Sequence, residues 1–301
     1  MANVPVISDL LTPFMLEAGA VRGRVVRLGD AANVVLGRYD YPPKVAQLLG
    51  ELLVVAALLS ANLKQSGIFT LQIRGEGIVP LVVVDAVFGG ALRGFADVSA
   101  EAAEKINAMK GVYSPRALVG EGAYLAITFD PGEDMQRYQG IVALEGDSIA
   151  DALTNYFTHS EQLEVEVRIA VEHQINWGAG GMMVERMPDA QLVGTEAGDE
   201  AWRYARAMFA TIQNDELIDP LLDASNFLYR LFHEEGVRVY PAHSLSVGCR
   251  CSRERIYNLL MSMSLADRAD MVVNGKIDVH CQFCNKSQIF SPQDVGLAGK
   301  Q

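Results

Sequence analysis

The arrangement of the cysteines restricts the fold of this chain more than any other feature of its sequence. All four cysteines of the 301 residues lie in the last 53, as the close pairs Cys249/Cys251 and Cys281/Cys284, with 29 residues between the pairs. Two such pairs on separate segments are typical of a tetrahedral tetrathiolate zinc site, because each turn supplies two thiolates. The sequence therefore predicts one Zn²⁺ bound by all four cysteines. Four protein ligands leave no open coordination position, so this metal would be structural rather than catalytic.

The segment that carries the cysteines is short for an independent domain. Residues 245–301 are near the size at which a hydrophobic core alone barely suffices. Structural zinc contributes roughly 10–16 kcal/mol of coupled folding free energy, whereas whole domains are stable by only about 5–15 kcal/mol. We therefore expect this segment to unfold when the metal is lost.

Local patterns predict the elements around the cysteines. Ser252 is placed to cap a helix over 253–263, and a second helix is expected from Leu265 to near Gly275, since glycine commonly terminates helices. Residues 276–280 and 287–290 have the pattern of two strands on either side of a tight turn at Cys281–Cys284.

The sequence leaves the reactivity of the site open. An inert zinc ribbon is the commoner case, but the Cys-x-Cys spacing and the nearby Arg250, Arg253 and Arg255 favour reactive thiolates, because cations stabilise them. The same arginines would equally balance the charge of the site. Four cysteines allow three disulfide pairings. Pairing within each close pair would remove the tie across 29 residues and so unfold the segment, whereas the other two pairings would keep the cross-link.

The rest of the chain predicts an α+β fold with a large N-terminal domain of mixed sheet and helix. Strand-like runs and helical patterns alternate without a regular βα order, which disfavours a doubly wound sheet. The expected strands are 21–28, 67–74, 80–87, 123–129 and 137–144, and the expected helices are 45–64 and 148–159. We place the large N-terminal α+β domain at 1–188, a helical linker at 189–244 and a small C-terminal zinc-binding domain at 245–301.

One segment resembles a membrane span. Residues 45–63 are almost wholly apolar, but they contain Gln47, Glu51 and Asn62 and no second span accompanies them. A helix buried on nearly all sides is the better interpretation. Residues 1–11 carry no signal peptide, so we expect a cytoplasmic protein with reduced cysteines.

Residues 198–236 predict two or three short amphipathic helices broken at Pro220. The default expectation is a helical connector packed on the large domain. Its aromatic residues would form an adhesive surface if the connector detached. These candidate contact residues are Trp202, Phe209, Phe227 and Phe232.

Charge and motif content disfavour several functions. The net charge of −12 argues against a nucleic-acid-binding face. The five histidines occur singly and no G-x-S-x-G motif is present, so we predict that the chain is not an enzyme. A zinc-ribbon module that recruits a protein or nucleic acid remains the alternative, and an oxidoreductase using Cys281 and Cys284 ranks below it.

Short motifs occur along nearly the whole chain: Arg22-Gly23, Tyr41-Pro42, Leu63-Lys64, Leu71-Gln72 with Gly75 and Gly77, Arg93-Gly94, Arg137-Tyr138-Gln139-Gly140, Leu144-Glu145-Gly146-Asp147, Ser160-Glu161-Gln162, Ala179-Gly180-Gly181-Met182, Cys249-x-Cys251-Ser252-Arg253 and Cys281-x-Phe283-Cys284. Together with the cysteine pattern, these motifs resemble the 33 kDa chaperonin family of redox-regulated heat-shock holdases. Two positions depart from the family pattern: Asn285, where glycine is frequent, and Gln288, where an aromatic residue is common.

The resemblance implies an ATP-independent chaperone that is inactive while reduced and zinc-bound. Oxidants would expel Zn²⁺ and form the disulfides Cys249–Cys251 and Cys281–Cys284, after which the zinc domain and then the metastable linker would unfold. The exposed surface would bind unfolding client proteins. The active form is expected to dimerise and later to pass clients to an ATP-dependent foldase system.

Overall fold

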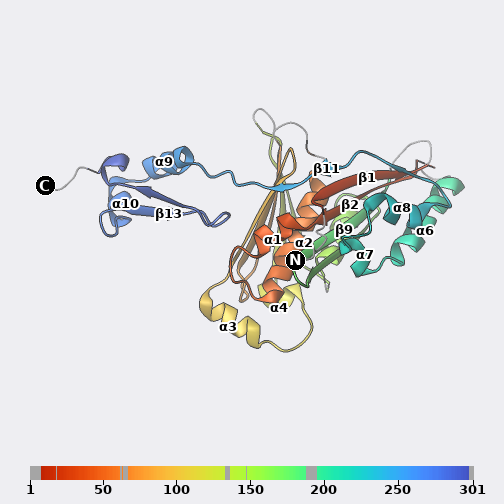
Figure 1. Ribbon diagram of the computed structural model, residues 1–301, viewed down its shortest axis with the longest axis horizontal. Helices are drawn as coiled ribbons and strands as arrows, with labels where there is room; N and C mark the ends of the chain where they lie inside the picture. Colours follow the sequence, from red (N-terminus) through yellow and green to blue (C-terminus); the bar gives the residue numbers. More distant parts are fainter. Residues whose placement is uncertain are drawn as a thin grey trace, which may run out of the picture. The chain divides into compact units, whose positions relative to one another are not determined.

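The computed structural model describes residues 8–17, 19–61, 63, 67–132, 136–146, 148–187 and 195–297 (Figure 1). The chain divides into two compact units, Met1–Val247 (unit 1) and Gly248–Gln301 (unit 2). The expected boundary between residues 188 and 189 lies outside the described residues. The mixed α+β fold class is confirmed.

Unit 1 contains two six-stranded sheets. Sheet A has the order β10-β1-β2-β9-β8, with β11 also paired to β1, and all its pairs are antiparallel. Its strands are β1 (Leu10–Leu16), β2 (Val21–Leu28), β8 (Val165–His173), β9 (Trp177–Arg186), β10 (Val237–Val239) and β11 (His243–Ser244). Sheet B has the order β12-β5-β4-β3-β6-β7, in which only the β12–β5 pair is parallel. Its strands are β3 (Ile68–Arg74), β4 (Leu81–Val87), β5 (Ala91–Asp97), β6 (Tyr124–Asp130), β7 (Tyr138–Ala143) and β12 (Ser246–Val247).

The apolar helix α2 (Pro43–Ser60) lies between the two sheets and belongs to the main hydrophobic core. The prediction of a buried helix is confirmed, although the helix ends at Ser60 and the expected end at Lys64 lies outside the described residues. By length and composition α2 is able to cross a membrane, but 72% of its apolar window is buried within the fold. The other helices of this core region are α1 (Asp30–Leu36), α3 (Ala100–Ala108), α4 (Pro115–Val119) and α5 (Ile149–His159).

Glycines allow sheet A to approach α2 closely. A Cβ atom on Gly181 of β9 would lie 2.5 Å from Cγ1 of Val54, and one on Gly50 of α2 would lie 2.7 Å from Cγ1 of Val171. Glycine lowers the strand propensity of a segment, which is why the local pattern of β9 does not predict a strand. The strands β1, β5 and β8 are also absent from the sequence prediction.

The opposite face of sheet A is covered by three helices: α6 (Glu196–Ala210), α7 (Asn214–Ile218) and α8 (Ala224–Phe232) (Figure 1). Alternation along the strands separates the two faces. Met182 and Met183 are adjacent in β9, yet Met183 belongs to the core around α2 and Met182 to the core beneath these helices. We call residues 195–232 the linker helices. The default expectation of a helical connector packed on the large domain is confirmed.

Unit 2 is built from α9 (Arg253–Ser262), α10 (Leu265–Asp270), β13 (Ile277–His280), β14 (Ser287–Phe290) and a short 3-10 turn over Gln293–Val295. The predicted cap is confirmed, since Oγ of Ser252 accepts a hydrogen bond from the Arg255 amide. The second helix is shorter than predicted because it ends at Asp270, and Gly275 instead has φ +74° in the turn before β13. Among the described residues of this unit, the buried core consists of five apolar side chains: Ile256, Leu260, Ile277, Phe290 and Val295.

A carboxylic acid on α2 predicts a pH-dependent stability. Glu51 is partly buried and accepts a hydrogen bond from Oη of Tyr113 at 2.9 Å. Burial is the main cause that raises the pKa of Glu51 from 4.5 to about 7, and hydrogen bonds from Tyr113 and Gln47 oppose it. The folded state therefore binds this proton more tightly than the unfolded state does. The resulting stability is complete below pH 4.5 and is lost as the pH rises through 7.

We expect the free energy of unfolding of the wild type to fall by about 2–3 kcal/mol, relative to Glu51→Gln, between about pH 5 and about pH 8. Urea denaturation across this range measures the difference. Glu101→Gln is the control, because Glu101 is exposed and pairs with Lys105, one turn along α3. Parallel pH profiles for the wild type and Glu51→Gln would contradict the prediction.

Candidate metal centre

The four cysteines converge in unit 2, where their Sγ atoms all lie within 4.8 Å of one another. The Sγ–Sγ distances are 3.3 Å for Cys249–Cys251, 3.6 Å for Cys249–Cys281 and 3.4 Å for Cys251–Cys284. Each distance is well beyond the roughly 2.05 Å of a disulfide bond. A tetrahedral zinc ion with Zn–S bonds of about 2.3 Å separates its sulfurs by about 3.8 Å. Four thiols at this spacing therefore fit a zinc ion.

Backbone hydrogen bonds position the second pair in the β13–β14 hairpin. The Cys281 amide donates to Lys286 O at 3.0 Å, and the Asn285 amide donates to Cys281 O at 2.7 Å. Asn285 has φ +54°, a left-handed conformation that favours glycine and that asparagine tolerates better than most residues. This backbone requirement gives a physical reason for the frequent glycine at this position in the family pattern, and asparagine satisfies it.

The first pair precedes α9, and two arginines close to it in the sequence make structural contacts. Arg253 donates to Ile289 O at 2.7 Å, and its guanidinium carbon lies 4.2 Å from the centroid of the Phe290 ring. Arg255 donates to Arg250 O at 3.3 Å. Arg253 therefore ties the start of α9 to β14, the strand that follows the second cysteine pair.

The thiols differ in acidity. Burial alone would raise the pKa of Cys249, but a hydrogen bond from the Cys251 amide and hydrogen bonds with the other three thiols outweigh it and lower this pKa to about 6. The pKa values of Cys251 and Cys281 are raised, with burial as the largest cause. The hydrogen bonds within the cluster, rather than the arginines, are thus the main source of the low Cys249 pKa. His280 lies outside the cluster, with its Nε2 3.4 Å from Asp278.

The candidate contact residues of the linker helices are brought together elsewhere, in unit 1. Trp202, Phe209, Phe227 and Phe232 are all buried in the core between these helices and sheet A. Phe232 stacks on Phe14 of β1 with 5.7 Å between ring centroids. In this conformation none of the four side chains presents a surface to a partner.

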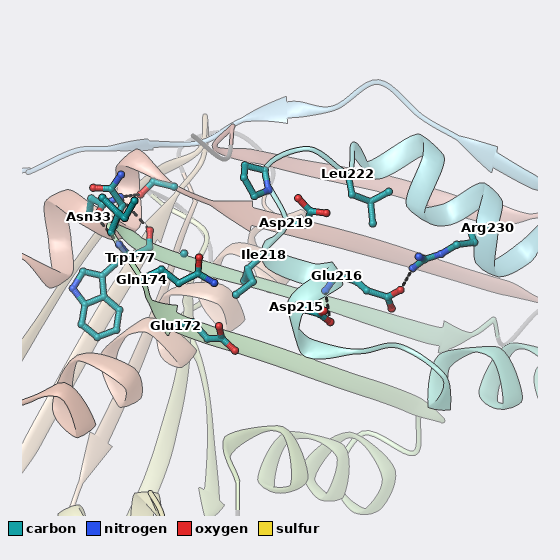
Figure 2. Close-up of a pocket in the computed structure, with 15 residues that line it drawn as sticks. Asn33, Glu172, Gln174, Trp177, Asp215, Glu216, Ile218, Asp219, Leu222 and Arg230 are labelled. Carbon is teal, nitrogen blue, oxygen red and sulfur yellow. Dashed lines mark hydrogen bonds and ion pairs between the residues drawn. The ribbon is translucent and has the colours of Figure 1, made fainter. Parts of the chain in front are cut away.

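Unit 1 also contains a cavity that sequence patterns do not reveal. It has a volume of about 610 Å³ and lies between the β8–β9 turn and the helices α1, α7 and α8 (Figure 2). Figure 2 shows Glu172, Asp215, Glu216 and Asp219 around it, with Trp177 at one end. Glu216 is paired with Arg230, Asp219 accepts from the Leu221 amide and Asp215 accepts from the Glu216 amide, so three of these carboxylates have structural partners. No local motif marks the cavity, because its walls come from distant parts of the chain.

Comparison with known proteins identifies the family. The family model described as Hsp33 protein matches residues 9–291. The chain belongs to the Hsp33 family. The 33 kDa chaperonin of Caulobacter vibrioides is 39% identical over 295 residues, which cover 95% of this chain and 96% of the relative. The 33 kDa chaperonin of Pseudomonas aeruginosa is 39% identical over 290 residues, which cover 96% of this chain and 93% of the relative.

The fold agrees with this family. The crystal structure of the 33 kDa chaperonin of Thermotoga maritima superposes with a TM-score of 0.79 at 23% sequence identity, covering 95% of this chain and 96% of that one. Hsp33 proteins are chaperones, so a chaperone role that involves unfolded client proteins follows for this chain. The prediction that the chain is not an enzyme is confirmed by the family.

Proposed function

We propose that this protein is a cytoplasmic, ATP-independent holdase chaperone whose activity is switched on by oxidation of Cys249, Cys251, Cys281 and Cys284. The observation that carries the proposal is the cluster of all four thiols within 4.8 Å, in a chain of the Hsp33 family. In the reduced state the four thiolates would hold one Zn²⁺, which supplies a cross-link between the segment before α9 and the β13–β14 hairpin.

The cross-link matters because unit 2 has little else to stabilise it. Its buried core, over residues 248–297, consists of five apolar side chains, and Cys281 and Cys284 lie in the turn of a two-stranded sheet. A two-stranded hairpin is marginally stable by itself. Loss of the metal is therefore expected to unfold the whole of unit 2 rather than only the turn.

Oxidation removes the metal ligands. In each disulfide formed, two thiolates released from the metal lose two electrons to hydrogen peroxide, which takes up two protons from the solvent and is reduced to two molecules of water. We propose the pairs Cys249–Cys251 and Cys281–Cys284, as the family resemblance implies. The measured Sγ distances support this pairing no more than the pairing of Cys249 with Cys281 and Cys251 with Cys284. Only the local pairs would release the long-range tie, so they favour unfolding.

Unfolding would then spread to the linker helices. The chain between α8 and Cys249 is held to unit 1 by β10, β11 and β12, strands of only two or three residues. Release of the linker helices would expose Trp202, Phe209, Phe227 and Phe232 together with the apolar face of sheet A beneath them. This surface would bind unfolding clients. The oxidised protein would dimerise and later pass its clients to an ATP-dependent foldase system.

The test is light scattering by a chemically denatured client diluted into buffer with this protein. One sample is reduced and zinc-loaded, a second is treated with peroxide at mild heat, and a third is treated and then reduced again in the presence of zinc. We expect several-fold lower scattering only in the oxidised sample, with release of about one zinc ion per chain. Absence of suppression in every sample, with zinc retained after peroxide, would instead favour an inert zinc ribbon that recruits a partner.

A further inference from the structure

The linker helices are held on sheet A by polar contacts as well as by their apolar core. Arg27 of β2 donates hydrogen bonds to Glu216 O at 2.7 Å and to Asp219 O at 3.1 Å. Arg168 of β8 donates to Ile212 O. Both arginines reach from strands of the sheet to main-chain carbonyl groups of the linker helices, so these contacts depend on the path of the linker backbone.

Of these two arginine side chains, Arg27 is the more buried. Its exposed fraction is 7%, and its guanidinium carbon lies 5.7 Å from the centroid of the Phe227 ring on α8. The carbonyl groups that it binds lie within α7 and just beyond its C-terminal end, where the last carbonyls lack partners inside the helix. A buried guanidinium at this place is favourable only while these carbonyls are present, because an unpaired buried charge is costly.

The sheet surface next to Arg27 is shaped for the same helix. Arg27 pairs with Gly180 of β9 in the register of the two strands. A Cβ atom on Gly180 would lie 2.3 Å from Leu217 O, so the backbone of α7 rests directly on the strand. Any other residue at 180 would push α7 away from the arginine that binds it. Arg27 and Gly180 therefore form one seat for α7.

Not every hydrogen-bond donor of the Arg27 guanidinium has a partner in the described part of the chain. Nε of Arg27 is buried without a hydrogen-bond partner among the described residues. A cavity of about 110 Å³ adjoins it, lined in part by Thr12, Asp219 and Asp223. A cavity of this size with polar side chains in its lining has room for water. At this contact a few specific hydrogen bonds hold the linker helices in addition to their apolar packing on sheet A.

We propose that Arg27, seated beside Gly180, is the latch that keeps the linker helices on sheet A in the reduced protein and sets how readily they detach. The role of the latch in activation rests on the proposed function. Detachment hydrates the guanidinium and frees the two carbonyls, so the docked and detached states differ by a defined set of bonds. Weakening these hydrogen bonds therefore releases the linker helices and leaves the metal centre unchanged.

The test uses the full chain in its reduced, zinc-loaded form. Arg27→Met removes both hydrogen bonds but keeps an apolar side chain of similar length. Gly180→Ala disturbs the same seat from the opposite strand and leaves Arg27 intact. The matched control is Arg206→Met, because Arg206 also ties a linker helix to sheet A, through an exposed ion pair with Glu166. Amide hydrogen exchange over residues 196–232, zinc content and client scattering are measured for each variant.

We expect amide hydrogen exchange over residues 196–232 to become about 10- to 100-fold faster in both seat variants. In Arg27→Met two carbonyl groups lose a charged donor, and in Gly180→Ala the added methyl group displaces α7. Arg206→Met should stay within about twofold of the wild type. Zinc content should not change, and the two seat variants should suppress client aggregation while still reduced.

Two results would overturn the latch. One is exchange over 196–232 in both seat variants that matches the wild type. The other is fast exchange with zinc retained but no suppression by the reduced variants, when oxidised wild type does suppress. If oxidised wild type also fails to suppress, the proposed function fails instead, and the exchange rates alone still decide whether Arg27 holds the linker.

Discussion

Cys281→Ser is expected to lose the bound zinc of the reduced protein and to unfold unit 2. The hydroxyl of serine does not replace a thiolate, so the site would keep only three of its four ligands. Metal binding of this kind contributes roughly 10–16 kcal/mol to folding, and the five-residue core of unit 2 offers little to offset its loss. We expect less than about one tenth of the wild-type zinc content after dialysis. The amides of α9, β13 and β14 should lose their exchange protection, while those of α2 keep theirs.

The matched control is His280→Ser, which changes the neighbouring residue. His280 is exposed and contacts Asp278, outside the cysteine cluster. We expect this variant to retain zinc and a folded unit 2. Cys284→Ser should behave like Cys281→Ser. Wild-type zinc content in either cysteine variant would contradict the assignment of the metal ligands.

Phe232→Ala is expected to destabilise the docked linker helices by about 3–5 kcal/mol, the usual cost of truncating a buried aromatic residue. Phe232 is fully buried, and its ring stacks on Phe14 and also lies 6.4 Å from the Tyr204 ring. Its truncation would leave a cavity between α8, α6 and β1. The measurement is the free energy of opening of residues 196–232, taken from native-state hydrogen exchange of the reduced protein.

Tyr229→Ala provides the control on the same helix. Tyr229 lies about one turn before Phe232 and is 66% exposed, so its truncation should change the opening free energy by less than about 0.5 kcal/mol. Equal opening free energies for the two variants would contradict the burial of the linker core. Because Phe232 is also a proposed client contact, client binding by the oxidised variant is a separate measurement.

The structure gives the arginines near the first cysteine pair a different role from those that their sequence positions suggest. The sequence places Arg250, Arg253 and Arg255 beside the first cysteine pair, where they would either activate the thiolates or balance the charge of the site. In the structure, Arg253 binds Ile289 O and the Phe290 ring, and the lowered pKa of Cys249 comes mainly from the Cys251 amide and the other thiols. Sequence distance to a cation is therefore a weak guide to thiol acidity, since side chains of this length reach other partners.

The sequence alone determined the features whose signals are local. Alternating apolar residues marked β2, β3, β4, β6 and β7, and a continuous apolar run marked α2 as a buried helix. Ser252 marked the start of α9. The cysteine spacing was sufficient to predict that four thiols converge, because two close pairs on separate segments are typical of one tetrathiolate metal site.

Only the tertiary structure decided the features that depend on distant segments. Gly180 and Gly181 obscure β9 in the sequence, yet β9 is a central strand of sheet A. The two glycines are needed there because α7 approaches one of them closely and α2 the other. In the sequence Arg27 is an ordinary polar residue of a strand, and only the fold places two carbonyl groups of the α7 region within its hydrogen-bonding distance. Local propensity reflects the energy of a residue within its own segment, whereas close backbone approach and buried hydrogen bonds depend on which segments the fold brings together.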